Sequence, residues 1–128
     1  MNKVVHFEVP FKDKERAKKF YSEIFGWKII SMPYNGGEYI MAQTAKTDEK
    51  GMIQDDPGSI NGGMVPKDDS APATVLVLDV ENVDEKVKEV EKAGGKVIMP
   101  KTKVMEMGLY AKVKDTEGNV IGLWENIK

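Results

Sequence analysis

The chain has 128 residues, 41% hydrophobic and 31% charged, a composition typical of one globular domain and not of a disordered chain. Nineteen basic and twenty-one acidic residues give a net charge of -2 without a basic block, which argues against nucleic-acid binding. Cysteine is absent, so disulfides and thiolate sites are excluded and a cytoplasmic location is expected. No apolar run approaches the ~20 residues of a membrane-spanning helix, and no signal-peptide pattern precedes the first strand, so no membrane partner is expected.

The first half of the chain predicts a strand, a helix and then further strands. Alternation gives the first strand one face with His6 and Glu8 and an opposite face with Phe7. The helix has Asp13 as its expected N-cap and Gly26 as its stop, and an Asn-Gly turn joins the next two strands. The expected elements are a strand at 4–9, a helix at 13–25, and strands at 27–34, 37–44 and 60–65.

The second half repeats this order of elements. Asn82 is the expected N-cap of a helix that stops at Gly94, with Glu85 completing an approximate capping box. The expected strands lie at 74–80, 96–99, 108–114 and 119–125. We therefore expect a single domain over 1–128, with module one at about 1–66 and module two at about 73–128. A non-repeated α+β sandwich with the same order of elements is the alternative.

Three segments of the chain carry a family resemblance. They are VVHFEVPFKDKERAKKFYSEIFGWKI at 4–29, ENVDEKVKEVEKAGGKVIMPKT at 81–102 and DTEGNVIGLWE at 115–125. Together they closely resemble the glyoxalase/bleomycin-resistance/extradiol-dioxygenase superfamily, also called vicinal oxygen chelate proteins. The resemblance implies an α+β fold of two βαβββ modules, forming a curved eight-stranded mixed sheet around a cavity with the helices outside. Family members use that cavity for a divalent metal that chelates substrate oxygens, or hold an apolar ligand without a metal.

The resemblance also implies four metal-ligand positions, at His6, about Val65, about Val75 and Glu125. His6 and Glu125 match the ligand pattern. Val65 and Val75 do not, because an isopropyl side chain offers a cation no lone pair. Glu8 shares a strand face with His6, so a His-Glu-Glu set for zinc, nickel, manganese or iron is conceivable. Two good ligands hold a divalent ion weakly, so the expected metal site is incomplete.

The alternation of side chains between the two faces of a strand also bears on His6, Glu8 and Glu125. Glu125 shares a face with Leu123 and Ile121, and we expect that face and the face of His6 to turn inward. Glu8 and Glu125 are the candidate catalytic carboxylates, because a buried histidine–glutamate pair can transfer a proton. The alternative is that His6 is a hydrogen-bonded strand residue and Glu125 a solvated one.

Four larger side chains are candidate ligand-binding residues, either as planar surfaces or as a flexible apolar contact. They are Tyr39, Met64, Tyr110 and Trp124. Packing within the core is the alternative for each of them. The adjacent glycines Gly62 and Gly63 permit close backbone approach, either to the neighbouring module or to a ligand.

Three functions follow as hypotheses. The first is a lyase, isomerase or dioxygenase of the glyoxalase type that acts on a small oxygenated substrate with an incomplete metal site. The second is a metal-free protein that sequesters a small apolar or aromatic molecule in the same cavity. The third is an accessory domain whose cavity is filled by side chains. A homodimer is expected, because relatives are often dimers and exposed edge strands are pairing surfaces.

Overall fold

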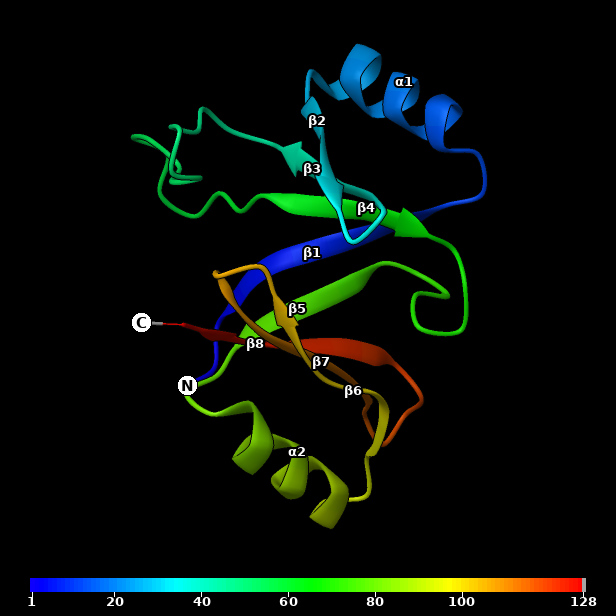
Figure 1. Cartoon of the computed structure of the whole chain (residues 1–128), viewed down its shortest axis with the longest axis vertical. Coiled ribbons are helices and arrows are strands. Elements are labelled where there is room, and N and C mark those ends of the chain that lie inside the picture. The colour runs from blue at the N-terminus through cyan, green and yellow to red at the C-terminus, as the bar shows by residue number, and fades with distance from the viewer. Residues whose placement is uncertain (128) are drawn as a thin grey trace. The chain divides into compact units, whose positions relative to one another are not determined.

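The computed structural model describes residues 1–127, which form eight strands and two helices. In chain order these are β1 (Val4–Phe11), α1 (Lys14–Phe25), β2 (Lys28–Tyr34), β3 (Gly37–Gln43), β4 (Gly62–Pro66), β5 (Val75–Asp79), α2 (Val83–Lys92), β6 (Lys96–Val104), β7 (Gly108–Lys114) and β8 (Val120–Asn126). They belong to two compact units, one of which is His6–Thr74 and the other the remaining described residues. The predicted α+β fold of two βαβββ modules is confirmed (Figure 1).

The two modules share one strand arrangement, which confirms the predicted repeat. In the first module the strand order is β2-β3-β4-β1, and β1 runs parallel to β4 while the other pairs are antiparallel. In the second module the order is β6-β7-β8-β5, again with one parallel pair, β5 with β8, and antiparallel pairs elsewhere. Each module therefore has a mixed sheet whose first and last strands lie side by side.

Local signals set the limits of α1. The Asp13 carboxylate accepts a hydrogen bond from the backbone N–H of Arg16 at 3.0 Å, and Gly26 ends the helix in the left-handed conformation with φ 72°. The helix packs through Ala17 and Tyr21 on one face of the first sheet, against the buried cluster of Ile40, Ala42 and Met64. That face is therefore the core of the first module.

The second module is built in the same way. The Asn82 side chain accepts a hydrogen bond from the N–H of Glu85 at 2.9 Å and so caps α2, as predicted. The helix covers a core of five buried residues, Val80, Val83, Ala111, Val113 and Leu123. Strand β6 continues to Val104 instead of ending near residue 99, because register shifts on either side of Met99 carry the pairing past Pro100.

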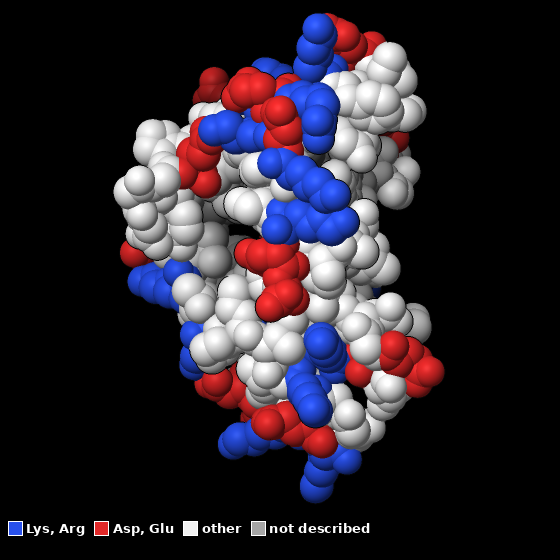
Figure 2. Space-filling view, turned by 90° about the vertical axis from the view of Figure 1, so that its right-hand side faces the viewer, with Lys and Arg blue, Asp and Glu red and all other residues white. Residues whose placement is uncertain are grey.

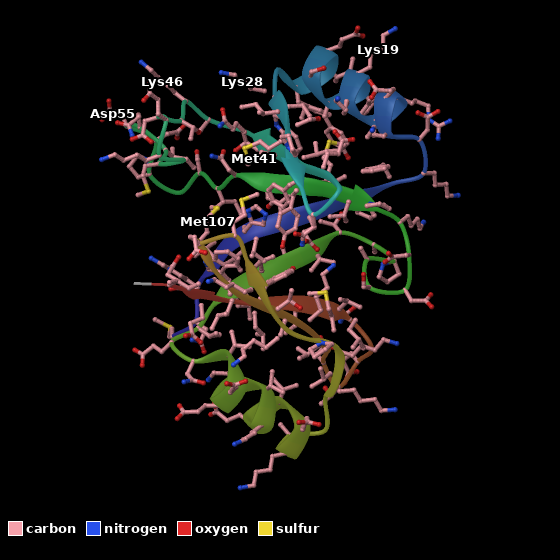
Figure 3. The ribbon with its side chains drawn as sticks, in the orientation of Figure 1. Lys19, Lys28, Met41, Lys46, Asp55 and Met107 are labelled. Carbon is pink, nitrogen blue, oxygen red and sulfur yellow. The ribbon has the colours of Figure 1, made fainter. Side chains whose placement is uncertain are left out.

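The surface carries charges of both signs, as the composition indicates (Figure 2). On the face drawn in Figure 2, lysine and arginine side chains alternate with aspartate and glutamate. Among the described residues, neither helix has the length and apolar character needed to cross a bilayer. Lys19 points from α1 away from the strands, and Lys46 and Asp55 belong to the loop between β3 and β4 (Figure 3).

Candidate functional site

The first sheet has a second face, opposite α1, and this face carries the candidate site. Strand register aligns Glu8 with Gly63, Gly63 with Met41, and Met41 with Ile30, and register partners point to the same side of a sheet. His6 joins them because it lies two residues before Glu8. The side chains of this face include His6, Glu8, Ile30, Met32, Tyr39 and Met41, the last of which is labelled in Figure 3.

A histidine–tyrosine pair lies at the centre of this face. The hydroxyl oxygen of Tyr39 is 3.3 Å from Nε2 of His6, and both side chains are partly buried. The pair joins β1 to β3 across the intervening strand β4, where Gly63 offers no side chain. The structure thus brings together two residues that the sequence singled out for different reasons, His6 as a metal ligand and Tyr39 as a ligand-binding surface.

Burial keeps both members of the pair uncharged. Desolvation lowers the pKa of His6, and it outweighs the opposing effects of the Glu8 charge and of a hydrogen bond to the backbone of Asn61. Desolvation together with the Glu8 charge raises the pKa of Tyr39 to about 12. At neutral pH the site therefore presents a neutral imidazole beside a protonated phenol.

The tautomer of His6 follows from its partners. A bond to a backbone group that raises a histidine pKa is a ring N–H donating to a carbonyl, here that of Asn61. Because Nε2 faces Tyr39, the donor is Nδ1, and Nε2 is left as an acceptor for the Tyr39 O–H. The site thus contains a hydroxyl donor and a basic ring nitrogen next to each other.

Asn61 is a positioning residue for the ring of His6, through the hydrogen bond to its backbone. Its side-chain oxygen accepts from the N–H of Thr44 at 2.9 Å, and its amide donates to Thr47 Oγ1 at 2.9 Å. These bonds tie the end of the long loop to its start, directly after β3, and hold the Asn61 backbone against His6. The sequence does not signal this role, because the same Asn-Gly-Gly run at 35–37 forms the hairpin turn.

Glu125 lies in a different environment from the one expected. It shares the β8 face of Leu123, as predicted, but that face packs against α2. Its carboxylate oxygen Oε1 accepts a hydrogen bond from the N–H of Val83, the first residue of α2, at 2.8 Å. The carboxylate thus satisfies one of the free N–H groups of the helix and lies at the positive end of its dipole.

Met64 lies in the first core and not on the face of His6. It is 3% exposed and packs with Ile40 and Ala42 beneath α1. Its neighbour Gly63 points to the opposite face, because successive strand residues alternate. The structure therefore places Met64 where the core-packing alternative expected it.

Tyr110 and Trp124 lie together in the second module. They are register partners on β7 and β8, with ring centroids 6.2 Å apart, and Trp124 Nε1 donates to the side-chain oxygen of Asn126 at 2.9 Å. Each ring covers a glycine of the neighbouring strand, Tyr110 over Gly122 and Trp124 over Gly108. This face also contains Lys112, which is 4% exposed and which sequence reasoning overlooked.

The donor set does not fit a divalent metal. Among residues 1–127, no three histidine, cysteine, aspartate or glutamate side chains lie close enough to bind one ion. The first module supplies one imidazole and one carboxylate, and the adjacent phenol stays protonated. Of the other three expected positions, two are valines, of which Val75 is fully buried, and the Glu125 carboxylate accepts the N–H of Val83. A catalytic zinc ion normally has three protein ligands, so this set falls short.

Comparison with known proteins places the chain in a family. The sequence model of the Glyoxalase/Bleomycin resistance protein/Dioxygenase superfamily matches residues 3–123. The chain belongs to this superfamily. It is 33% identical over 115 residues to the putative glyoxylase CFP32 of Mycobacterium tuberculosis, covering 88% of this chain but only 41% of that protein. A glyoxylase-like domain-containing protein of Didymella fabae is 33% identical over 120 residues, with 88% and 84% coverage.

Solved structures share the fold at low sequence identity. Methylmalonyl-CoA epimerase from Mycobacterium tuberculosis superimposes with a TM-score of 0.64 at 14% identity, covering 98% of this chain and 88% of that one. The hypothetical protein BH1468 from Bacillus halodurans gives a TM-score of 0.66 at 13% identity, with 99% and 96% coverage. At these sequence identities, both similarities show only that the fold is shared. The chemistry of this chain must be inferred from its own residues.

Proposed function

We propose that the chain is a small-molecule-binding member of its superfamily, which holds a small oxygenated compound on the His6–Tyr39 face without a metal. The observation that carries the proposal is the 3.3 Å contact between Tyr39 Oη and His6 Nε2, in which a hydroxyl donor and a neutral ring nitrogen are partly buried side by side. Buried polar groups of this kind impose a strong preference on a ligand, because a ligand that leaves them unpaired loses binding energy.

The chemistry of the site defines the class of ligand. A carbonyl or hydroxyl oxygen accepts the O–H of Tyr39, and a ligand O–H donates to His6 Nε2. Ile30, Met32 and Met41 supply apolar surface on the same face, and methionine adapts to ligands of different shape. The expected ligand is therefore small, uncharged near its bound oxygen, and apolar elsewhere.

A ligand screen with and without chelator tests this function. Compounds that carry a carbonyl or hydroxyl group should raise Tm in the wild-type protein, and a chelator should leave the shift unchanged. The shift should be smaller in Tyr39→Phe, which keeps the ring and loses the donor. Calorimetry with zinc, nickel, manganese and iron should show no stoichiometric binding. A ligand-induced rise in Tm that disappears with chelator, or stoichiometric metal binding in calorimetry, would overturn the proposal.

Isomerisation by proton transfer is the second candidate, and the carboxylate of Glu8 favours it. Glu8 is 7% exposed, and its charge acts on both His6 and Tyr39. In this reaction His6 Nε2 takes a proton from a carbon next to a carbonyl group, and the electron pair moves to the carbonyl oxygen. Tyr39 donates a hydrogen bond to that oxygen, Glu8 stabilises the imidazolium, and the proton returns to the carbon.

Hydrogen exchange separates the two candidates. Methylmalonyl-CoA is the natural probe, because epimerases of this thioester are among the structural neighbours. An isomerase should exchange the hydrogen next to its carbonyl group for deuterium in heavy water, and Glu8→Gln or His6→Gln should slow that exchange by roughly two to four orders of magnitude. A protein that binds ligands but catalyses no such exchange is a binding protein alone.

A further inference from the structure

The chain contains the same tripeptide, Asn-Gly-Gly, in two different environments, at 35–37 and at 61–63. An asparagine followed by glycine is prone to lose its side-chain amide, because a glycine leaves its own backbone nitrogen free to attack the side-chain carbonyl carbon. In a folded chain the reaction requires that the asparagine side chain and the next backbone nitrogen can move together. The structure distinguishes the two copies on this point.

Asn35 meets this requirement. It lies with Gly36 in the two-residue turn between β2 and β3, where Tyr34 is the register partner of Gly37 (Figure 1). Asn35 is exposed, and among residues 1–127 its side chain has no hydrogen-bond partner. A Cβ atom built at Gly36 would meet nothing within 4 Å. Nothing around the turn therefore holds either reacting group in place.

Asn61 does not meet it. Its side-chain oxygen accepts from the N–H of Thr44 and its amide donates to Thr47 Oγ1, both at 2.9 Å. Gly62 is buried in β4, and a Cβ atom there would lie 2.4 Å from the ring of Phe7. The Gly62 nitrogen can reach the Asn61 side chain only if β4 opens, and opening a central strand costs far more free energy than opening a turn.

We propose that Asn35 is a deamidation site, and that isoaspartate formed there weakens the contact between Tyr39 and His6. The Gly36 nitrogen gives up its proton and forms a bond to Cγ of Asn35, while the carbon–nitrogen bond of the side-chain amide breaks. The released nitrogen takes up a proton and leaves as ammonia. Water then opens the resulting succinimide ring at one carbonyl group to give aspartate, or at the other to give isoaspartate.

Isoaspartate does not fit this turn. Asn35 and Gly36 have φ of 47° and 77°, as a two-residue hairpin turn requires, whereas isoaspartate adds a methylene group to the backbone. The pairing of β2 with β3 at this end depends on the turn, and the pairing of β3 with β4 covers residues 40–42. Tyr39 lies between the two, opposite Met32, and so depends on the turn for its place. Aspartate tolerates the left-handed conformation and leaves the turn intact.

Peptide mapping by mass spectrometry tests the modification, with Asn61 as the control within the same chain. In urea the two asparagines should convert at similar rates, because their neighbours are the same two glycines. In the folded protein at neutral pH, Asn35 should convert about tenfold or more faster than Asn61. Equal rates in the folded protein, or no conversion of Asn35 over a time that converts it in urea, overturn the proposal.

Asn35→Gly is the matched variant, because glycine keeps the left-handed turn and lacks the reacting amide. In the folded protein this variant should lose the signal of an isoaspartyl methyltransferase assay. A signal as strong as that of the wild-type protein means that the isoaspartate forms at another residue, and it overturns the assignment to Asn35.

A second measurement tests the effect on the site. Ion exchange separates the converted protein, which has an additional negative charge, and NMR then records the ring protons of His6, the single histidine. The isoaspartate form should shift these signals, and Asn35→Asp, which carries the same charge, should retain the wild-type signals. Unchanged signals in the isoaspartate form, or equal shifts in both proteins, overturn the effect on His6. Neither measurement uses a ligand, so a failure of the proposed function leaves both results valid.

Discussion

The pH dependence of folding gives a direct check on the buried state of His6. Burial lowers its pKa in the folded chain, so the unfolded chain takes up the proton more readily. The contribution of neutral His6 to stability is therefore fully present above the ordinary pKa of 6.5. It is lost as the pH falls from there toward the lowered pKa of the folded state.

The magnitude follows from one proton, since the chain has a single histidine. Within that window the free energy of unfolding should fall by at most about 1.4 kcal/mol per pH unit. Glu8 and the backbone of Asn61 raise the pKa of folded His6 and so oppose the effect of burial. They therefore narrow the pH range over which the free energy of unfolding falls. At the lower end of the window the slope from His6 returns to zero.

Urea unfolding of the wild-type protein and of His6→Gln, at a series of pH values between about 5 and 8, measures this contribution. The difference between the two slopes belongs to His6, because all other titrating groups are shared. The single histidine also permits an NMR titration of its ring protons. Identical slopes for the two proteins, or a folded-state pKa at or above 6.5, would refute the reasoning.

Three other changes have expected outcomes. Tyr39→Phe should remove from the ultraviolet titration the tyrosine that ionises at about pH 12, and a spectrum that keeps this component would contradict the assignment. Glu125→Ala removes the acceptor of the Val83 N–H and should cost about 1 kcal/mol in urea unfolding, whereas Glu125→Gln keeps an acceptor and should cost less; equal losses would exclude the capping role. Gly62→Ala forces the Phe7 ring to move and should destabilise by about 1–3 kcal/mol, and an unchanged Tm would show that the core relaxes freely.

The fold was predictable because its signals are local. The helix caps at Asp13 and Asn82 and the left-handed Gly26 were each expected from one or two neighbouring residues, and the structure shows each of them. The Asn35-Gly36 turn has positive φ at both residues, as a tight hairpin requires. Such features depend on backbone sterics and hydrogen bonds within a few residues.

The candidate site was less predictable because alternation does not say which face of a strand meets the helix. Alternation placed Glu125 on the face of Leu123 and Ile121, and the structure has it there. We expected that face to turn toward the site and Met64 to contact a ligand, whereas both pack beneath the helices. The distance of 3.3 Å between His6 and Tyr39 depends on register across three strands, which no local signal in the chain encodes.

The two tryptophans divide between the modules. Trp27 stacks on Tyr21 in the first module, with ring centroids 4.8 Å apart, and Trp124 pairs with Tyr110 in the second. Each module therefore carries its own fluorescent reporter, and replacing either tryptophan by phenylalanine leaves a probe of the other module alone. Coincident urea transitions in the two single-tryptophan proteins would mean that the repeated halves melt as one cooperative unit, and separate transitions would mean that each half has a stability of its own.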